Sequence, residues 1–315
     1  MLKSEGYSFR RINKENFLDL IPIYESAFGI LFNQEAFKKK LETSKFVIEP
    51  VGFIAYDKNN LPSAFYGVYP CLVEYKGKKY LVAQSGDTMT HSDHTGKGLF
   101  TKLATKTYEY CKENGFHLIF GFPNENSFPG FIKRLGWSHF DDLTPYLIRV
   151  KCIPWIRIKN TFRLPQSMHN KWCRFQLNRL KKGLPFNSSC LTDDNPVVDH
   201  SEAFFSYKTY GENYLIQVKG INVWLKFDDT FLLIGDLEKC SEAEFLVVIR
   251  KLKNIAFWMG LPHLRFHASS NTWGERMFKK HGVPMEVCYP IGGINFTHEI
   301  PLEKMKFTAA DNDTF

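Results

Sequence analysis

Residues 90–103 of the chain read Thr90-His91-Ser92-Asp93-His94-Thr95-Gly96-Lys97-Gly98-Leu99-Phe100-Thr101-Lys102-Leu103. The residues before this turn, 80–89, have the pattern of a strand, and those after it, 99–114, repeat apolar side chains at helical spacing. A glycine-rich turn between a strand and a helix leaves backbone N–H groups unpaired at the positive end of the helix dipole. The turn therefore predicts an anion site, and the usual anion at such a place is a phosphate or pyrophosphate.

The glycine pair matches two phosphate-binding motifs only in part. Thr101 stands where a dinucleotide fingerprint has its third glycine, and the turn lacks the spacing and the lysine–serine pair of a P-loop. The downstream sequence is more informative. A short apolar strand at 117–122 is followed by the polar loop 123–127 and by a short helix, 128–135, that ends at Gly136 and Trp137.

Together the two segments resemble the GNAT superfamily of acyl-coenzyme-A-dependent N-acyltransferases, over roughly residues 7–150. The family's pyrophosphate loop, Arg/Gln-x-x-Gly-x-Gly/Ala, corresponds to the loop from Thr95 to Phe100, and the end of its second helix corresponds to Lys133-Arg134-Leu135-Gly136-Trp137. Thr95 replaces the usual Arg or Gln, but main-chain N–H groups can still bind the pyrophosphate. Phe100 replaces a small residue, and its side chain is expected either in the helix–sheet packing or at the edge of the cofactor.

The resemblance implies acetyl-coenzyme A, or another acyl-coenzyme A, as co-substrate, and no metal. The pantetheine arm would lie between two splayed strands, one ending near Met89 and the other near Phe122. The cofactor-binding residues implied are Met89, Thr90, Thr95, Gly96, Lys97, Gly98, Leu99, Phe100, Thr101 and Asn124. Asn124 has an alternative role in the turn chemistry of its Pro-Asn-Glu-Asn-Ser loop, and the sequence leaves both open.

Acyl transfer to an amine also needs a base and a proton donor. Asp87, on the predicted cofactor strand, is the candidate base, and its alternative is a turn carboxylate without a catalytic part. Many family members have a Tyr four residues before the glycine of the second helix, where this chain has Ile132. Ser127 and Tyr146 are candidate substitutes for that proton donor, and the alternative for Ser127 is a helix N-cap. A member without a strong acid can also work, because coenzyme A thiolate is a fair leaving group. We expect His91 and His94 to be exposed loop residues.

Composition limits the class of protein. The chain has 315 residues, 44% of them hydrophobic, which is enough for two packed domains. No apolar run approaches the ~20 residues that cross a bilayer, and none follows residues 1–5 as a secretory leader would, so we expect a cytoplasmic protein. Seven scattered cysteines without a Cys-x-x-Cys pair indicate reduced thiols and no structural zinc site.

The net charge of +8 originates in one segment. Residues 143–192 hold ten Lys or Arg and no Asp or Glu, while the rest of the chain is slightly acidic. A helix predicted at 168–182 places Met168, Trp172 and Phe175 near one face and basic residues on another. The segment could be a solvated connector, a surface for an anionic or lipid-linked substrate at the inner face of a membrane, or an RNA contact. Nucleic acid is the partner we expect least.

The order of elements predicts an α/β fold (an α+β mixed sheet) with two tandem GNAT-like domains. We expect an acyl-CoA-binding domain at 1–150, a basic connector with an amphipathic helix at 151–192, and a second domain with a polar, frayed tail at 193–315. The second domain repeats the succession strand, helix, strand, short helix and His-Gly. It is predicted to be degenerate, because the segment from Gly235 to Cys240 lacks paired glycines and carries two acids.

The function predicted from these features is transfer of an acetyl or other acyl group from coenzyme A to a small-molecule primary amine. An amino sugar of surface polysaccharide assembly is one candidate acceptor. Two alternatives stay open: a non-catalytic GNAT-like binding module, and a Fem-type aminoacyl transferase that uses charged tRNA. The second fits less well, since such enzymes do not need the glycine loop found here.

Overall fold

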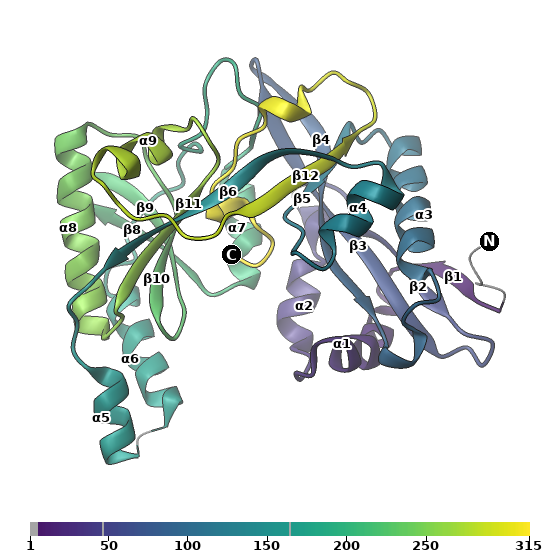
Figure 1. Cartoon of the computed structure of the whole chain (residues 1–315), viewed down its shortest axis with the longest axis horizontal. Coiled ribbons are helices and arrows are strands. Elements are labelled where there is room, and N and C mark those ends of the chain that lie inside the picture. Colours follow the sequence, from purple (N-terminus) through teal and green to yellow (C-terminus); the bar gives the residue numbers. More distant parts are fainter. Residues whose placement is uncertain (1–5, 46, 164) are drawn as a thin grey trace. The chain divides into compact units, whose positions relative to one another are not determined.

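The computed structural model describes residues 6–45, 47–163 and 165–315 (Figure 1). Residues 1–5, on which the expectation of no leader partly depends, lie outside this range. The described residues fall into two units. The first runs to Phe140 and includes Ser206–Tyr210 and Pro290–Lys304, and the second contains the remainder. We describe each unit by itself.

The first unit is a mixed sheet with helices on both faces. Its strands follow the order β1-β2-β3-β4-β5-β12, antiparallel except for the parallel pair β4–β5. The strands are β1 (Ser8–Arg11), β2 (Val51–Tyr56), β3 (Pro62–Tyr75), β4 (Lys78–Thr90), β5 (Leu118–Gly121) and β12 (Tyr289–Asn295). The helices are α1 (Leu20–Phe28), α2 (Gln34–Lys40), α3 (Leu99–Glu113) and α4 (Phe128–Leu135).

The two faces of this sheet carry separate cores, because neighbouring side chains of a strand point in opposite directions. Tyr66 of β3 packs in a cluster with residues of α3 and α4, while its neighbour Phe65 packs in another with residues of α1 and α2. The sheet is thus covered on both faces, with α3 and α4 on the face opposite to α1 and α2.

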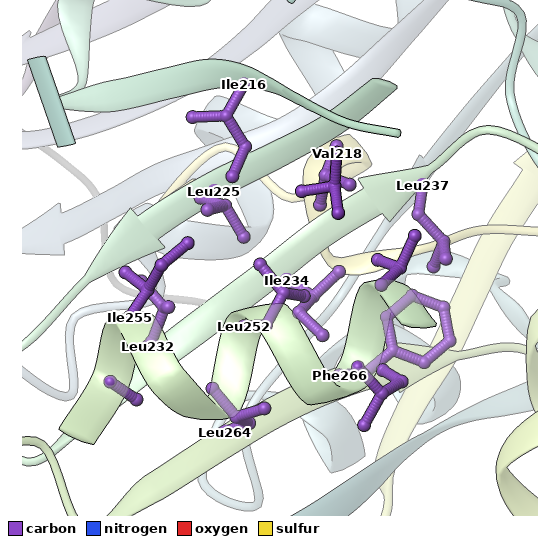
Figure 2. Packing of buried hydrophobic residues seen from close by; sticks show 14 of the residues in the cluster. Ile216, Val218, Leu225, Leu232, Ile234, Leu237, Leu252, Ile255, Leu264 and Phe266 are labelled. Carbon is purple, nitrogen blue, oxygen red and sulfur yellow. The ribbon is translucent and has the colours of Figure 1, made fainter. Parts of the chain in front are cut away.

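The second unit has the strand order β6-β11-β10-β9-β8, with β10 and β11 parallel and the other pairs antiparallel. Its strands are β6 (Ser138–Arg149), β7 (Val197–Val198), β8 (Asn213–Val218), β9 (Ile221–Phe227), β10 (Phe231–Leu237) and β11 (His263–Ala268). Its helices are α5 (Trp155–Phe162), α6 (Gln166–Asn178), α7 (Glu202–Tyr207), α8 (Glu242–Met259) and α9 (Trp273–Lys280). Figure 2 shows its core, where Leu252 and Ile255 of α8 pack against strand residues such as Leu232 and Leu264.

Each unit contains a strand that follows the other unit's last helix in the sequence. β12 comes after α9 but pairs with β5 of the first unit, whereas β6 comes after α4 but pairs with β11 of the second unit. The structure therefore groups the chain differently from the contiguous stretches 1–150, 151–192 and 193–315. Domain boundaries read along the sequence cannot detect such an exchange. Each of the two strands follows directly on one unit in the sequence, so the sequence alone assigns it to that unit.

The mixed α/β fold agrees with the prediction, and several elements match it closely. α4 has the expected bounds, 128–135, α3 begins at the expected residue, and the predicted connector helix is present as α6. Sequence analysis missed α5, β6, β8 and β12. None of the helices in the described part of the chain is long and apolar enough to cross a membrane.

The expectation that the tail is frayed is wrong. Phe307, Ala310 and Phe315 are all at most 1% exposed. A Cβ on Gly235 would lie 2.1 Å from Cζ of Phe315, so the missing side chain makes room for the terminal ring. Asp311 accepts a hydrogen bond from the buried His200 ring at 2.8 Å. The polar residues of the tail are satisfied internally, which makes it part of the core.

Candidate active site

The parallel strands β4 and β5 are paired over a short length only. Their register joins Ala83 to Ile119 and Gln84 to Phe120. β5 ends one residue later at Gly121, but β4 continues to Thr90, paired on its other edge with β3. Because the β4–β5 register stops at Gln84, the edge of β4 beyond it can pair with an extended ligand as an added strand would.

The turn after β4 has the backbone of an anion site. Gly96 and Gly98 have φ values of +73° and +72°, in the left-handed region that glycine adopts without cost. Gly98 is the N-cap of α3, and no side chain of the described residues caps it. The first turn of α3 contains no acidic residue, and a Cβ on Gly96 would meet nothing within 4 Å. The start of α3 thus has neither a side-chain cap nor an acid among the described residues, which leaves its N–H groups and the helix dipole available to a phosphate.

In the second unit, the helix α8 connects the parallel strands β10 and β11, and its first turn is already capped. Ser241 and Glu244 form a reciprocal capping box at the start of α8, so two N–H groups are already satisfied. Glu242 and Glu244 also place two carboxylates in the first turn, where they oppose an anion. Of the two helix starts, the one at α3 fits a pyrophosphate.

Hydrogen bonds within the loop and one to Tyr7 hold the glycine loop in place. The Tyr7 hydroxyl and the Lys97 ammonium both approach Nδ1 of His94, at 2.7 and 3.4 Å. Lys97 Nζ also donates to the carbonyl oxygen of Asp93 at 2.9 Å, and the Thr95 hydroxyl donates to the carbonyl oxygen of Ser92 at 3.0 Å. Desolvation, with a smaller effect from Lys97, lowers the pKa of His94. These contacts hold the loop in place around Thr95, where the resemblance led us to expect an Arg or Gln.

Several predicted cofactor residues have side chains in the core. Met89 and Leu99 are each 2% exposed. Phe100 packs between Tyr66 and Phe131, with ring centroids at 6.0 and 5.2 Å, which places its side chain in the helix–sheet packing. Such residues can offer a ligand only their backbone. The Thr101 hydroxyl is buried without a hydrogen-bond partner in the described structure.

Asp87 lies at a β-bulge that sets the direction of its side chain. The β3–β4 register slips between Phe65 and Gly67, and Asp87 has φ +46°. Its Oδ2 accepts hydrogen bonds from Lys40 Nζ at 2.6 Å and from the Tyr69 hydroxyl. The carboxylate is 16% exposed and is held in a fixed position by a cation and a phenol.

Asn124 and Ser127 form the turn that leads into α4. Oδ1 of Asn124 accepts the N–H groups of Asn126 and Ser127 at 3.1 and 2.9 Å. Ser127 is the N-cap of α4 by position, but its hydroxyl donates to the carbonyl oxygen of Asn124 at 3.3 Å and makes no cap bond. The turn chemistry considered for Asn124 is present. Tyr146 belongs to the second unit, where burial raises the pKa of its hydroxyl.

The sequence did not indicate that Lys40 and Tyr69 contact Asp87, or that Tyr69 lies opposite Gln84. Tyr69 lies opposite Gln84 in the β3–β4 register, and Nε2 of Gln84 is buried without a hydrogen-bond partner in the described structure. Gly77 at the hairpin turn, with φ +72°, is the sequence signal that could have set this register. No comparable local signal points to Lys40, which comes from α2.

Ser85, which follows Gln84 in β4, begins a chain of three hydroxyl groups. The Ser85 hydroxyl lies 2.8 Å from that of Tyr66, which in turn lies 3.1 Å from that of Tyr108. Trp137 Nε1 donates to the Tyr108 hydroxyl at 2.8 Å. Within the described residues, no group of three or more His, Cys, Asp or Glu could hold a metal ion.

Comparisons with known proteins agree with this architecture. A family model described as an acetyltransferase (GNAT) domain matches residues 8–140. No curated protein sequence matches the chain. A probable N-acyltransferase of Enterococcus faecalis V583 superposes with a TM-score of 0.62 at 11% identity, over 92% of this chain and 73% of its own.

Two further solved structures share the fold. Saccharomyces cerevisiae N-myristoyltransferase with bound myristoyl-CoA has a TM-score of 0.55 at 9% identity, over 92% of this chain and 83% of its own. The glucosamine N-acetyltransferase region of a fungal multi-domain β-N-acetylglucosaminidase has a TM-score of 0.55 at 12% identity, over 93% of this chain and 38% of its own. The family model therefore assigns residues 8–140 to the GNAT acetyltransferase superfamily, and the solved structures share the fold of the chain.

Proposed function

We propose that the chain is an N-acyltransferase that moves an acetyl or other acyl group from coenzyme A to a small primary amine. The observation that carries the proposal is the uncapped start of α3, with two left-handed glycines and no acid in its first turn. An acyl-coenzyme A, when bound, supplies an activated thioester carbonyl. The N–H groups from Gly96 to Thr101 would bind its phosphates, and the edge of β4 up to Thr90 would align its extended arm.

Asp87 is the proposed base. Lys40 and Tyr69 both bond to its Oδ2, which leaves Oδ1 to accept a proton from an amine or through a water molecule. Asp87→Asn keeps the size of the side chain but not its basicity, so we expect kcat to fall at least about 100-fold. Acetyl-coenzyme A binding should be retained, because Asp87 lies outside the glycine loop.

Ser127 is the proposed proton donor for the leaving thiolate. Its hydroxyl would first have to leave the carbonyl oxygen of Asn124. Because coenzyme A thiolate is a fair leaving group, Ser127→Ala should slow turnover much less than Asp87→Asn. Equal effects of the two substitutions on kcat would contradict these roles.

Calorimetry with acetyl-coenzyme A tests the binding step. We expect one ligand per chain, since α8 in the second unit is closed by its own capping box. Failure of the folded protein to bind acetyl-coenzyme A at millimolar concentration would exclude the proposal.

Thiol release in the presence of a panel of amines tests turnover. Glucosamine comes first on the panel, because an amino sugar is the acceptor that we propose. Binding of acetyl-coenzyme A without thiol release from any amine would favour the alternative, a non-catalytic GNAT-like module. Turnover that requires aminoacyl-tRNA in place of acetyl-coenzyme A would favour the Fem-type alternative.

We further propose a cytoplasmic location. The seven cysteines of the described structure are free thiols, as a reducing compartment would keep them. Fractionation of cells that produce the protein should recover it with the cytoplasm and the inner face of the membrane. Recovery from a secreted fraction would contradict this location.

A further inference from the structure

The second unit exposes apolar side chains on the helices α5, α6 and α8. Figure 1 shows α5 and α6 at the lower left, with α8 above them at the left. The surface forms a groove of about 850 Å³ whose described lining includes Trp155, Met168, Trp172 and Trp258. Apolar side chains this large are rarely left in contact with water over a continuous area unless they bind something. We call this area the helical groove.

The helix α6 has two apolar faces, and only one of them is used by the fold. His169, Cys173 and Leu177 are buried against the core of the unit. The opposite face carries Met168 and Phe175, which are 48% and 53% exposed. An amphipathic helix needs one apolar face to pack on its own protein, so the second face requires another explanation.

One indole ring of the groove is held by a hydrogen bond. Nε1 of Trp172 donates to the carbonyl oxygen of Trp258 at 2.8 Å, so this ring keeps its orientation while it is 39% exposed. Trp258 is 54% exposed, and Phe162, at the end of α5, is 70% exposed. Large amphipathic rings on a rigid surface are the side chains that prefer the boundary between lipid and water.

The charge of the same surface is positive. The described lining contains Lys171 and Arg179 and no acidic residue. Arg174 is already paired with Glu212, at 2.7 Å from Nε to Oε1, which leaves Lys171 and Arg179 as the cations of the groove. Lys181 and Lys182 are exposed and lie just after the end of α6.

Two acids that contact α6 are engaged by hydrogen bonds. Glu212 also accepts from the Tyr214 hydroxyl at 2.5 Å, and Asp229 accepts from Gln166 Nε2 at 3.0 Å. The groove therefore combines exposed aromatic and aliphatic side chains with uncompensated positive charge. That combination fits a partner with an apolar interior and a negatively charged surface.

We propose that the helical groove docks the protein on an anionic lipid bilayer. Trp172, Phe175 and Trp258 would enter the interfacial layer, and Lys171 and Arg179 would lie at the level of the lipid phosphates. Met168 and Phe162 have side chains without a hydrogen-bond donor, and such side chains can be buried completely in a bilayer. RNA would instead bind the basic residues mainly through its phosphates and would leave these apolar side chains exposed. The proposal does not depend on the acyltransferase activity.

The test is co-sedimentation with vesicles of phosphatidylcholine alone and of equimolar phosphatidylcholine and phosphatidylglycerol, at low and physiological salt. We expect at least tenfold stronger partition onto the anionic vesicles, and weaker binding as salt rises. Lys171→Gln/Arg179→Gln should reduce it about 25-fold, because a basic side chain near such a surface adds about fivefold. Phe162→Ser should reduce it about tenfold.

Lys58→Gln/Lys133→Gln is the matched control. Both lysines are exposed and lie in the first unit, so this variant loses the same charge and should partition like the wild type within twofold. All variants should keep the wild-type circular dichroism spectrum and the wild-type affinity for acetyl-coenzyme A. Equal binding to neutral vesicles, wild-type binding by the groove variant, or tighter binding to a single-stranded RNA than to anionic vesicles would each overturn the proposal.

Discussion

Gly98 illustrates how one residue makes the start of α3 available to a ligand. Its φ of +72° belongs to the region that a β-branched side chain enters only under strain, at a cost of roughly 1–2 kcal/mol. In Gly98→Val the backbone would turn away from this conformation and move its N–H group. We expect acetyl-coenzyme A to bind at least about tenfold more weakly, measured by calorimetry.

Gly77 supplies the control for this prediction. It has the same φ of +72° in the β3–β4 turn, and a Cβ on it would meet nothing within 4 Å. Gly77→Val should therefore lower stability by a similar amount and leave the affinity for acetyl-coenzyme A unchanged. Equal affinity in both variants would mean that the phosphates bind elsewhere.

Asp236 makes the stability of the second unit depend on pH. Desolvation by burial raises the pKa of this carboxyl from 3.8 to about 6, against smaller opposing effects of His200 and Ser189. A raised pKa in the folded state means that the native protein binds the proton more tightly than the unfolded chain does. The stability from this group is therefore complete below pH 3.8 and is lost as the pH rises through about 6.

Asp236→Asn removes this titration. We expect the free energy of unfolding of the wild type, relative to that of the variant, to fall by on the order of 2–3 kcal/mol between pH 3.8 and about 6. Urea unfolding at several pH values measures this difference directly. A difference that stays constant, or that rises with pH, would contradict the burial argument.

At the scale of elements, the carboxyl-terminal segment acts as part of the second core. The Phe315 ring lies 5.1 Å from that of Trp224 and occupies the space left by Gly235. Asp311 accepts the N–H of Thr308 at 2.7 Å and the His200 ring at 2.8 Å, which ties the last turn to the core. The segment thus closes the core next to β9 and β10.

Phe315→Ala should lower the stability of the protein by about 3–5 kcal/mol, because it removes a buried ring and leaves a cavity. Thermal or urea unfolding followed by circular dichroism measures this loss. Phe162→Ala is the control, since that ring is 70% exposed and its removal should change stability by less than about 0.5 kcal/mol. Similar losses for the two variants would show that Phe315 is not a core residue.

At the scale of the whole molecule, the exchanged strands make the two units depend on the continuity of the chain. Gly292 to Asn295 of β12 pair with Gly121 to Leu118 of β5. The strands approach so closely that a Cβ on Gly293 would lie 2.6 Å from the carbonyl oxygen of Ile119. Without β12, the fragment 1–150 keeps an exposed edge at β5, and such edges are unstable and prone to aggregate.

A fragment of residues 1–150 should therefore melt at a lower temperature than the intact chain, or aggregate, when followed by circular dichroism and size-exclusion chromatography. The intact chain is the control under the same conditions. A monomeric fragment that melts cooperatively at the temperature of the intact protein would show that β12 contributes little to the first unit.

The sequence by itself determined the local features of this protein. The apolar spacing of α8, the glycine turn before α3 and the Gly136 end of α4 depend on neighbours a few residues apart, so period and backbone preference suffice to predict them. The same local signals led to the GNAT resemblance at residues 95–100 and 133–137. They also placed Asp87 on the strand that precedes the glycine loop.

Only the tertiary structure determined which distant residues these elements contact. The pairing of Lys40 with Asp87, of β12 with β5, and of Asp311 with His200 joins residues that are 47 or more positions apart. Such contacts depend on which strand edges and buried charges the rest of the fold leaves unsatisfied, and no local pattern records that. The order of the tail could not be predicted for the same reason, because Asp311 is paired with His200, 111 positions away in the sequence.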